Sequence, residues 1–133
     1  MSIKVYTSYF SNVRNIPTDI ALVSIAGKTP NWLSIFKCNE LMPKYSWWKE
    51  WHDTFANNLE SDESKQWYIK HYKETVLNTL DAKMLIKHLS ELCNSDKICL
   101  LCYETPEKFC HRHIVSEWLN LNGVECSESF YKK

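Results

Sequence analysis

Short apolar runs alternate along the chain with longer stretches in which apolar residues recur every three or four positions. The short runs are residues 3–6, 19–27 and 98–102, and their β-branched and aromatic side chains predict β-strands. The second and third runs are almost continuously apolar, as expected of strands that are buried on both faces of a sheet. Polar Thr7 and Ser8 follow the first run and predict a loop at its carboxyl end.

Helical spacing dominates the second half of the chain. Residues 62–80 contain no Gly or Pro, follow a suitable N-cap residue in Ser61, and carry apolar side chains three to four positions apart. Asp81 is the expected cap of a further helix. The apolar face of that helix is expected to consist of Ala82, Leu85, Leu89 and Leu92.

A last helix is predicted between the third strand and the end of the chain. Thr105 suits its N-cap and Pro106 its first helical position. The helix is expected to end near Asn122 because Gly123 follows, and residues 124–126 predict a short final strand.

A helical wheel separates the two histidines of this last helix. Its apolar face is formed by Ile114, Val115, Trp118, Leu119 and Leu121. His111 falls in the middle of that face, so its imidazole is expected to point toward the sheet, whereas His113 falls on the polar side. Cys110 and Arg112 lie on the two shoulders of the apolar face.

Strands separated by helices predict an α/β fold, with a three-layer, Rossmann-like, mostly parallel sheet and helices on both faces. Residues 28–51 are irregular and rich in aromatic side chains, and we expect a long loop with short helical turns there. With 133 residues and 44% hydrophobic positions, residues 1–133 are expected to form a single domain.

The charge balance narrows the classes of partner. Sixteen basic and sixteen acidic residues give a net charge of zero, which does not favour a nucleic-acid grip spread over the surface. No apolar run approaches the roughly 20 residues of a membrane span, and the first residues lack a secretory signal. We therefore expect a cytoplasmic protein without a membrane partner, whose six cysteines are reduced.

The junction between the third strand and the last helix is the predicted site. Glu104 lies in the turn, and Cys110, His111 and Arg112 follow it. Ligands of open α/β sheets bind at the carboxyl ends of the strands, beside the amino ends of the helices. A structural interpretation remains open beside the functional one: Glu104 would pair with Arg112 while His111 bonds a backbone carbonyl.

In the catalytic interpretation the four residues have separate roles. Glu104 orients or charges His111, His111 acts as general acid and base, and Arg112 neutralises an anionic group. Cys110 is either the nucleophile or a packing residue. No reaction type follows from these residues.

No metal or other cofactor is expected from the cysteine spacing. Cys99 and Cys102 are three apart on a strand, so they point to opposite faces and cannot share a metal. A zinc site using Cys102, Cys110 and His111 would have irregular spacing. The turn after Cys102 resembles the phosphate loops of cysteine phosphatases and rhodaneses only faintly, because its acidic residues oppose an anion.

The loops after the first two strands are expected to reach the same edge of the sheet. We expect them, together with the aromatic segment, to supply the ligand-binding residues Tyr6, Ser8, Tyr9, Arg14, Ser24, Lys28 and Trp48. Hydroxyl and basic groups suit a phosphate, a carboxylate or a sugar, and an indole can stack on a base. The ligand is therefore expected to be small and anionic or nucleotide-like. The competing interpretation is that the basic residues are solvated and the tryptophans fill the core.

Three segments of the chain resemble the family called domain of unknown function 488. They are residues 6–10, residues 21–27, and the pair of motifs Leu100-Leu101-Cys102-Tyr103-Glu104 and Cys110-His111-Arg112. The resemblance implies a small cytoplasmic α/β protein of a bacterium or its virus, with a site at these motifs. It implies no established reaction, and the Trp-rich segment leaves the choice of ligand open.

Three functions follow from these observations. The first is a small protein that binds, and in its catalytic version processes, a nucleotide-like or other anionic ligand at the Glu/Cys/His/Arg site. The second is a non-catalytic module that sequesters a nucleotide signal or binds a protein through its Trp-rich loop. The third is a redox-sensing thiol protein, which requires a fast-reacting Cys110. The oligomeric state is left open.

Overall fold

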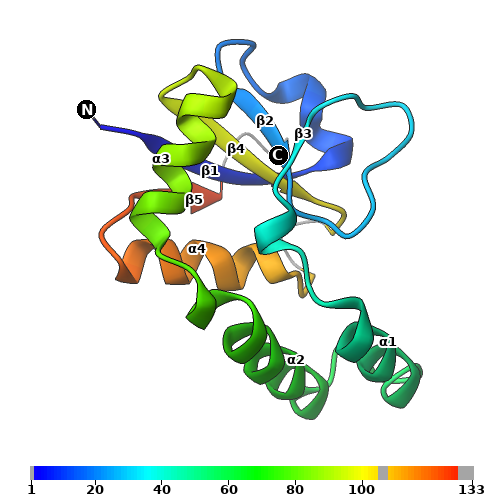
Figure 1. Cartoon of the computed structure of the whole chain (residues 1–133). Helices are drawn as coiled ribbons and strands as arrows, with labels where there is room; N and C mark the ends of the chain where they lie inside the picture. Colours follow the sequence, from blue (N-terminus) through cyan, green and yellow to red (C-terminus); the bar gives the residue numbers. More distant parts are fainter. Residues whose placement is uncertain (1, 105–107, 129–133) are drawn as a thin grey trace.

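Five parallel strands form the central sheet of the structure, a computed structural model that describes residues 2–104 and 108–128 (Figure 1). They are β1 (Lys4–Tyr9), β2 (Ala21–Ser24), β3 (Phe36–Lys37), β4 (Lys97–Cys102) and β5 (Cys126–Glu128), in the spatial order β3-β2-β4-β1-β5. Strand β4 pairs with β1 on one side and with β2 on the other. The predicted parallel α/β sheet is therefore confirmed, and the carboxyl ends of its central strands meet at one edge.

The α-helices cover one face of this sheet and the 3-10 helix at Phe10–Asn15 packs against the other, in agreement with the predicted three-layer α/β fold. The α-helices are α1 (Tyr45–Thr54), α2 (Asp62–Thr75), α3 (Ala82–Cys93) and α4 (His111–Leu121); the 3-10 helices are η1 (Phe10–Asn15), η2 (Asn39–Leu41) and η3 (Leu77–Thr79). Helices α3 and α4 pack on the strands, α2 packs against α4, and α1 packs against α2 (Figure 1). None of the helices in the described part of the chain has the length and apolar character needed to cross a bilayer.

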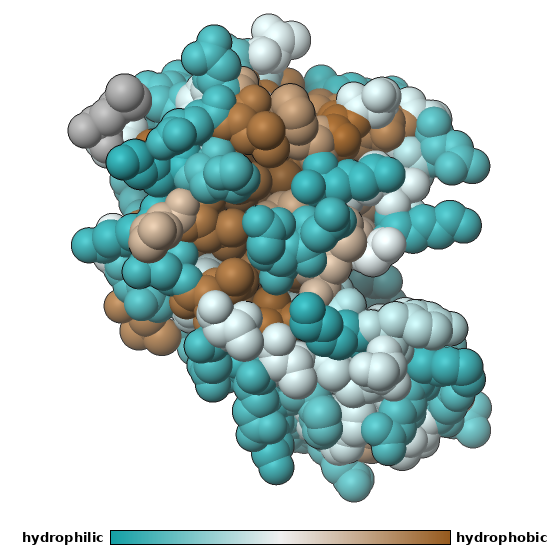
Figure 2. All heavy atoms as spheres, in the orientation of Figure 1, coloured by the Kyte–Doolittle hydropathy of each residue, from teal (hydrophilic) through white to brown (hydrophobic). Residues whose placement is uncertain are grey.

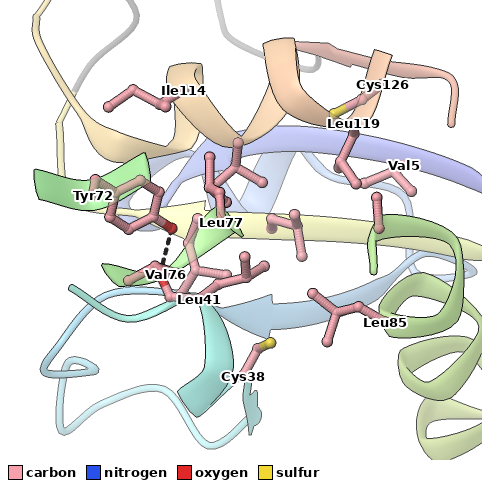
Figure 3. Packing of buried hydrophobic residues seen from close by; sticks show 14 of the residues in the cluster. Val5, Cys38, Leu41, Tyr72, Val76, Leu77, Leu85, Ile114, Leu119 and Cys126 are labelled. Atoms are coloured by element: carbon pink, nitrogen blue, oxygen red, sulfur yellow. Dashed lines mark hydrogen bonds between the residues drawn. The ribbon is translucent and has the colours of Figure 1, made fainter. Parts of the chain in front are cut away.

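Two apolar clusters lie on the two faces of the sheet. On the helical face Ile98 and Leu100 of β4 join a large cluster that includes Leu119 of α4, part of which is drawn in Figure 3. On the opposite face Cys99 and Leu101 join a smaller cluster with Phe10 and apolar residues of the neighbouring loops, and this cluster also includes Cys102 and Cys110. The continuous apolar run of β4 is thus buried on both faces, as its pattern predicted.

The two predicted helix caps are present. The Ser61 hydroxyl accepts a hydrogen bond from the backbone N–H of Ser64, and the Asp81 carboxylate accepts one from that of Met84. After α4 the chain turns at Gly123, whose φ of 82° lies in the left-handed region that favours glycine.

Three strands differ from their predicted ranges: the first, the last and β2, which covers residues 21–24 rather than 19–27. Strand β1 extends through Thr7 and Ser8, which were expected in a loop. These buried polar residues are tolerated because the Thr7 hydroxyl donates to Glu128 and the Ser8 hydroxyl accepts from Asn12. Strand β5 lies at residues 126–128 rather than 124–126.

The Trp-rich segment was wrongly predicted as a loop with short turns. It contains the ten-residue helix α1 and the two-residue strand β3. Aromatic packing holds α1 in place: the Trp51 ring lies edge-on to Tyr68 of α2, and its indole N–H donates to the side chain and the carbonyl of Ser64. Tertiary contacts of this kind are not visible in local sequence periodicity.

The helix predictions also need local correction. Helix α4 begins at His111, with Cys110 as its N-cap residue; the predicted cap Thr105 and first residue Pro106 lie outside the described residues. Leu92 and Leu121 were placed on buried helix faces but are exposed. His113, expected to face water, is half-buried.

Tyr72 joins α2 to η2 in the centre of the large cluster. Its side chain is fully buried, and its hydroxyl donates a 2.6 Å hydrogen bond to the backbone carbonyl of Leu41, the dashed line in Figure 3. We predict that Tyr72→Phe lowers the free energy of unfolding by about 1–3 kcal/mol, because a buried carbonyl loses its donor. Urea denaturation measures this change.

The matched control is Tyr45→Phe, which removes the same hydroxyl from an exposed ring. Its free energy of unfolding is expected to stay within about 0.5 kcal/mol of the parent protein. Equal effects of the two substitutions would contradict the structural role of the Tyr72 hydroxyl.

Candidate functional site

A pocket of about 700 Å³ lies at the carboxyl edge of the sheet. Its floor consists of Cys102 at the end of β4 and of Cys110 and His111 at the start of α4. Aromatic side chains line its walls: Tyr45, Trp48, Trp51, Tyr68, Tyr103 and Phe109. In Figure 2 the molecule is hollowed at the right, between the loop after β2 and α1, two segments that contribute to this lining.

The imidazole of His111 is fixed at the floor by a backbone hydrogen bond. Its Nε2 lies 2.7 Å from the carbonyl oxygen of Ile25, and a carbonyl can only accept, so Nε2 carries the proton. The side chain is 5% exposed, and its ring packs edge-on against Tyr72. The prediction that His111 points toward the sheet is confirmed.

The other ring nitrogen of His111 faces two cysteine sulfurs. Its Nδ1 lies 3.6 Å from Sγ of Cys102 and 3.9 Å from Sγ of Cys110. Because Nε2 donates its proton to Ile25, Nδ1 is the ring nitrogen that exchanges a proton with the two thiols. The arrangement can therefore take a proton from a cysteine and return it.

The two cysteines differ in acidity. Burial raises the pKa of Cys110, but hydrogen bonds from Cys102 and His111 and the backbone N–H of Arg112 outweigh it and hold the pKa well below its usual range. The hydrogen bond to Cys110 and burial instead raise the pKa of Cys102 well above its usual range. The pair therefore shares one proton, with the negative charge on Cys110 at the amino end of α4.

Arg112 is turned away from this floor and pairs with Glu128. Its guanidinium is fully buried, and Nε and Nη2 each donate a 3.0 Å hydrogen bond to the Glu128 carboxylate. Nη1 donates to the backbone carbonyl of Glu104, and the Tyr9 ring lies 5.8 Å from the guanidinium carbon. Thr7 donates to the same carboxylate. Arg112 thus fastens α4 to β1 and β5.

The expected roles of Glu104 and Arg112 are corrected by these contacts. The carboxylate partner of Arg112 is Glu128, and Glu104 contributes its backbone carbonyl instead. His111 is oriented by the carbonyl of Ile25 and not by Glu104. The Glu104 side chain is exposed and lines the pocket. The partner of Arg112 is therefore set by β5, which lies beside β1 in the sheet, and not by closeness in sequence to Glu104.

The predicted ligand-binding residues divide into two groups. Lys28 and Trp48 line the pocket. The others are placed elsewhere among the described residues: Tyr6, Ser8, Tyr9, Arg14 and Ser24. Ser24 accepts a hydrogen bond from Thr29, Tyr6 packs against the smaller apolar cluster, and Arg14 is exposed on η1. Because β1 is longer than predicted, its polar residues are buried within the sheet instead of lying in a loop at its edge.

Cys102 was not among the predicted site residues. Alternation along β4 puts its side chain on the same side of the strand as Ile98 and Leu100, and at the carboxyl end of the strand it packs in one cluster with Cys110. That parity could have placed it opposite the start of α4.

The cysteine spacing predicted no metal site. In the structure, however, the possible ligand atoms of Cys102, Cys110 and His111 all lie within 4.8 Å of one another, close enough to hold one metal ion.

Comparison with known proteins identifies one relationship. A family model described as the Active DUF488-N3 subclade matches residues 13–123. This span includes both motifs at the floor of the pocket and agrees with the resemblance that the sequence motifs carried. No curated protein and no solved structure matches the chain.

The Arg112–Glu128 pair generates a stability prediction. Glu128→Gln removes the carboxylate from a guanidinium that is 0% exposed, while Glu128 itself keeps 19% of its side chain exposed. We expect the free energy of unfolding to fall by about 2–4 kcal/mol, toward the lower end for broken buried ion pairs. Glu104→Gln is the matched control and should change it by less than about 0.5 kcal/mol. The opposite ranking in urea denaturation would restore Glu104 as the partner.

The acidity of Cys110 generates a prediction on pH dependence. Only the thiolate is alkylated, and a lowered pKa means that the thiolate of Cys110 is already formed at neutral pH. Its alkylation rate in reduced, metal-free protein is therefore expected to stay nearly constant from about pH 7 upward. Burial raises the pKa of Cys126 to about 11, so the rate of Cys126 should rise about tenfold per pH unit over the same range. Peptide mass spectrometry after timed iodoacetamide treatment separates the two.

The variant His111→Ala should slow alkylation of Cys110 at pH 7 by at least about tenfold, because it removes interactions that lower the pKa of that thiol. The control His113→Ala changes a neighbouring histidine that forms no hydrogen bond to either sulfur among the described residues, and it should leave the rate unchanged. A Cys110 rate that climbs with pH as the Cys126 rate does would show that Cys110 is an ordinary buried thiol.

Proposed function

Because the chain belongs to the DUF488 family, through the Active DUF488-N3 subclade, we propose that it binds a planar, nucleotide-like ligand in this pocket and processes it with the thiolate of Cys110. The observation that carries the proposal is the placement of His111 Nδ1 against two sulfurs at the floor of an aromatic-walled pocket. A thiolate paired with an imidazole is the arrangement of cysteine nucleophiles. The word "active" in the subclade's description agrees with a catalytic protein.

The walls of the pocket support a flat ligand. Trp48 stacks with His52 at 5.1 Å between ring centres, and Tyr45 stacks on Trp48 at 6.3 Å. Such flat surfaces bind bases with a stabilisation of about 1–3 kcal/mol per ring. A volume of about 700 Å³ is also within the range of small-molecule sites.

The charges support a ligand whose anionic part stays at the mouth. Lys28 is the one Lys or Arg side chain among the described lining residues, and it is exposed. Arg112 is engaged by Glu128 and cannot serve the ligand without losing that pair. A ring against the floor with a phosphate or carboxylate near Lys28 satisfies both constraints.

The floor supports a two-step displacement. In the first step Cys110, which has given its proton to Nδ1 of His111, forms a bond from Sγ to an unsaturated carbon of the ligand, such as an amide, ester or amidine carbon. The bond from that carbon to its nitrogen or oxygen leaving group breaks, and the leaving group takes the proton held at Nδ1 of His111. In the second step water bonds to the carbon and gives its proton to Nδ1, and Cys110 departs as thiolate. The net change is hydrolysis of one bond.

The non-catalytic alternative is less well supported by the aromatic residues. A docking surface on the Trp-rich segment requires several exposed indoles, but Trp32 is exposed by itself, while Trp47 and Trp51 are buried and Trp48 is half-buried. Trp47 and Trp51 pack on Tyr68 of α2, and Trp48 and Trp51 line the pocket. A module that sequesters a nucleotide signal would use the same pocket without the second step.

We predict that a panel of nucleosides and nucleotides contains a ligand that quenches tryptophan fluorescence saturably. Trp48→Ala should weaken its binding about tenfold, because one stacking surface is lost. Trp32→Ala is the matched control, since Trp32 is 67% exposed and does not line the pocket, and it should leave the affinity unchanged. Lys28→Ala should weaken a phosphorylated ligand more than its nucleoside. If the Trp48 and Trp32 variants lost affinity for the ligand equally, the pocket would not be the binding site.

Chemical processing is tested with the ligand that this panel identifies. Incubation with wild-type protein and analysis by mass spectrometry should show a hydrolysed product that Cys110→Ser protein does not form. The Cys110→Ser variant should still quench with ligand, which separates lost chemistry from lost folding. A ligand recovered unchanged after long incubation with wild-type protein would establish the sequestering module instead.

A further inference from the structure

We infer that Cys102, Cys110 and His111 form a zinc site whose occupation blocks the thiolate of Cys110. Metal binding stands on geometry alone; only its inhibitory consequence rests on the proposed function. The three side chains come from two elements that the sheet edge brings together, the end of β4 and the start of α4. All three are buried at the floor of the pocket.

The separations of the donor atoms match a tetrahedral zinc ion. Zn–S bonds of about 2.3 Å and Zn–N bonds of about 2.0–2.1 Å imply S···N edges of about 3.5–3.6 Å and an S···S edge of about 3.8 Å. The S···N distances are 3.6 Å to Cys102 and 3.9 Å to Cys110, and the three donor atoms lie within 4.8 Å of one another. Shifts of a few tenths of an ångström bring both S···N distances to those around a bound ion.

The orientation of His111 is that of a metal ligand. Histidines that bind metals through one ring nitrogen commonly donate the other N–H to a carbonyl or a carboxylate, which fixes the ring and makes the ligand more basic. Nε2 of His111 donates to the carbonyl of Ile25, and Nδ1 faces the two sulfurs. The ring therefore needs no rotation to accept a metal at Nδ1.

Charge balance favours a divalent, thiolate-preferring ion. Two thiolates neutralise Zn²⁺, so the buried complex has no net charge and avoids the desolvation cost of an isolated ion. Arg112, the nearest guanidinium in sequence, has its charge paired by Glu128. With three protein ligands, the fourth position faces the pocket, where water or a ligand atom can bind.

Zinc binding and thiol chemistry exclude each other at this floor. Binding of Zn²⁺ releases every proton held on the two sulfurs and on Nδ1, and the lone pairs of these three atoms enter bonds to the metal. Cys110 then cannot attack a ligand, and His111 cannot carry a proton at Nδ1. Removal of the metal restores both groups, so the ion acts as a reversible inhibitor.

The experiment titrates Zn²⁺ into reduced, chelator-treated full-length protein against a chromophoric competing chelator. We expect one tight equivalent in the wild type. Cys102→Ser, Cys110→Ser and His111→Ala should each lose at least about a hundredfold in affinity, because even outer partners of a metal site contribute about 10–100-fold. Cys93→Ser is the matched control: Cys93 ends α3, is half-buried and lies outside the cluster, so its affinity should equal that of the wild type.

A second measurement needs no variant that could fail to fold. Co²⁺ added to wild-type protein should give thiolate-to-cobalt charge-transfer absorption and the intense visible bands of a tetrahedral ion. Absence of these bands, or equal zinc affinity in wild-type and Cys110→Ser proteins, would overturn the site.

The inhibitory consequence is measured as alkylation of Cys110 at pH 7. One equivalent of Zn²⁺ should suppress it at least about tenfold, and excess chelator should restore it. Unchanged alkylation in the zinc-loaded protein would overturn the inference. The failure of the proposed function would look different. The protein would bind zinc tightly but bind no planar ligand, and its metal-free Cys110 would react slowly. That result would contradict the proposed function and still support the metal site.

Discussion

The hydrogen bond from His111 Nε2 to the carbonyl of Ile25 is the contact on which the site depends. It joins α4 to the chain leaving β2, two segments that are 86 positions apart in sequence. It also fixes which nitrogen carries the proton, and so it presents the other nitrogen to the cysteines. A ring free to rotate would offer neither a stable base nor a preformed metal ligand.

The rest of the fold protects this arrangement. The buried Arg112–Glu128 pair fastens the same helix to β1 and β5, so the first turn of α4 is held from both sides. The hydrogen bonds that lower the pKa of Cys110 come from Cys102, His111 and the backbone N–H of Arg112. Aromatic rings from α1 and α2 then close the pocket above the floor. Structural and chemical roles are thus divided between adjacent residues of one helix.

Local patterns predicted the fold well where one element decides its own structure. The continuous apolar run of β4 and the caps at Ser61 and Asp81 specify their elements from neighbouring residues alone. Helix α1 was missed because its order comes from the packing of Trp51 on another helix. The apolar face of α4 correctly predicted that His111 points inward. It could not predict that the carbonyl of Ile25 accepts the hydrogen bond from the imidazole.

The site was predictable only in part for the same reason. Adjacency in sequence found Cys110, His111 and Arg112, but pairing across the sheet decided that Glu128 and not Glu104 neutralises the guanidinium. Strand parity, applied to Cys102, would have brought the second sulfur into the site.

The most direct test of the account is the protonation of His111, read from two-bond ¹H–¹⁵N correlation spectra of reduced, metal-free, ¹⁵N-labelled protein at neutral pH. The account predicts an Nε2 proton in slow exchange with water; a bare Nε2 with the proton on Nδ1, or a ring averaged by solvent exchange, would contradict it.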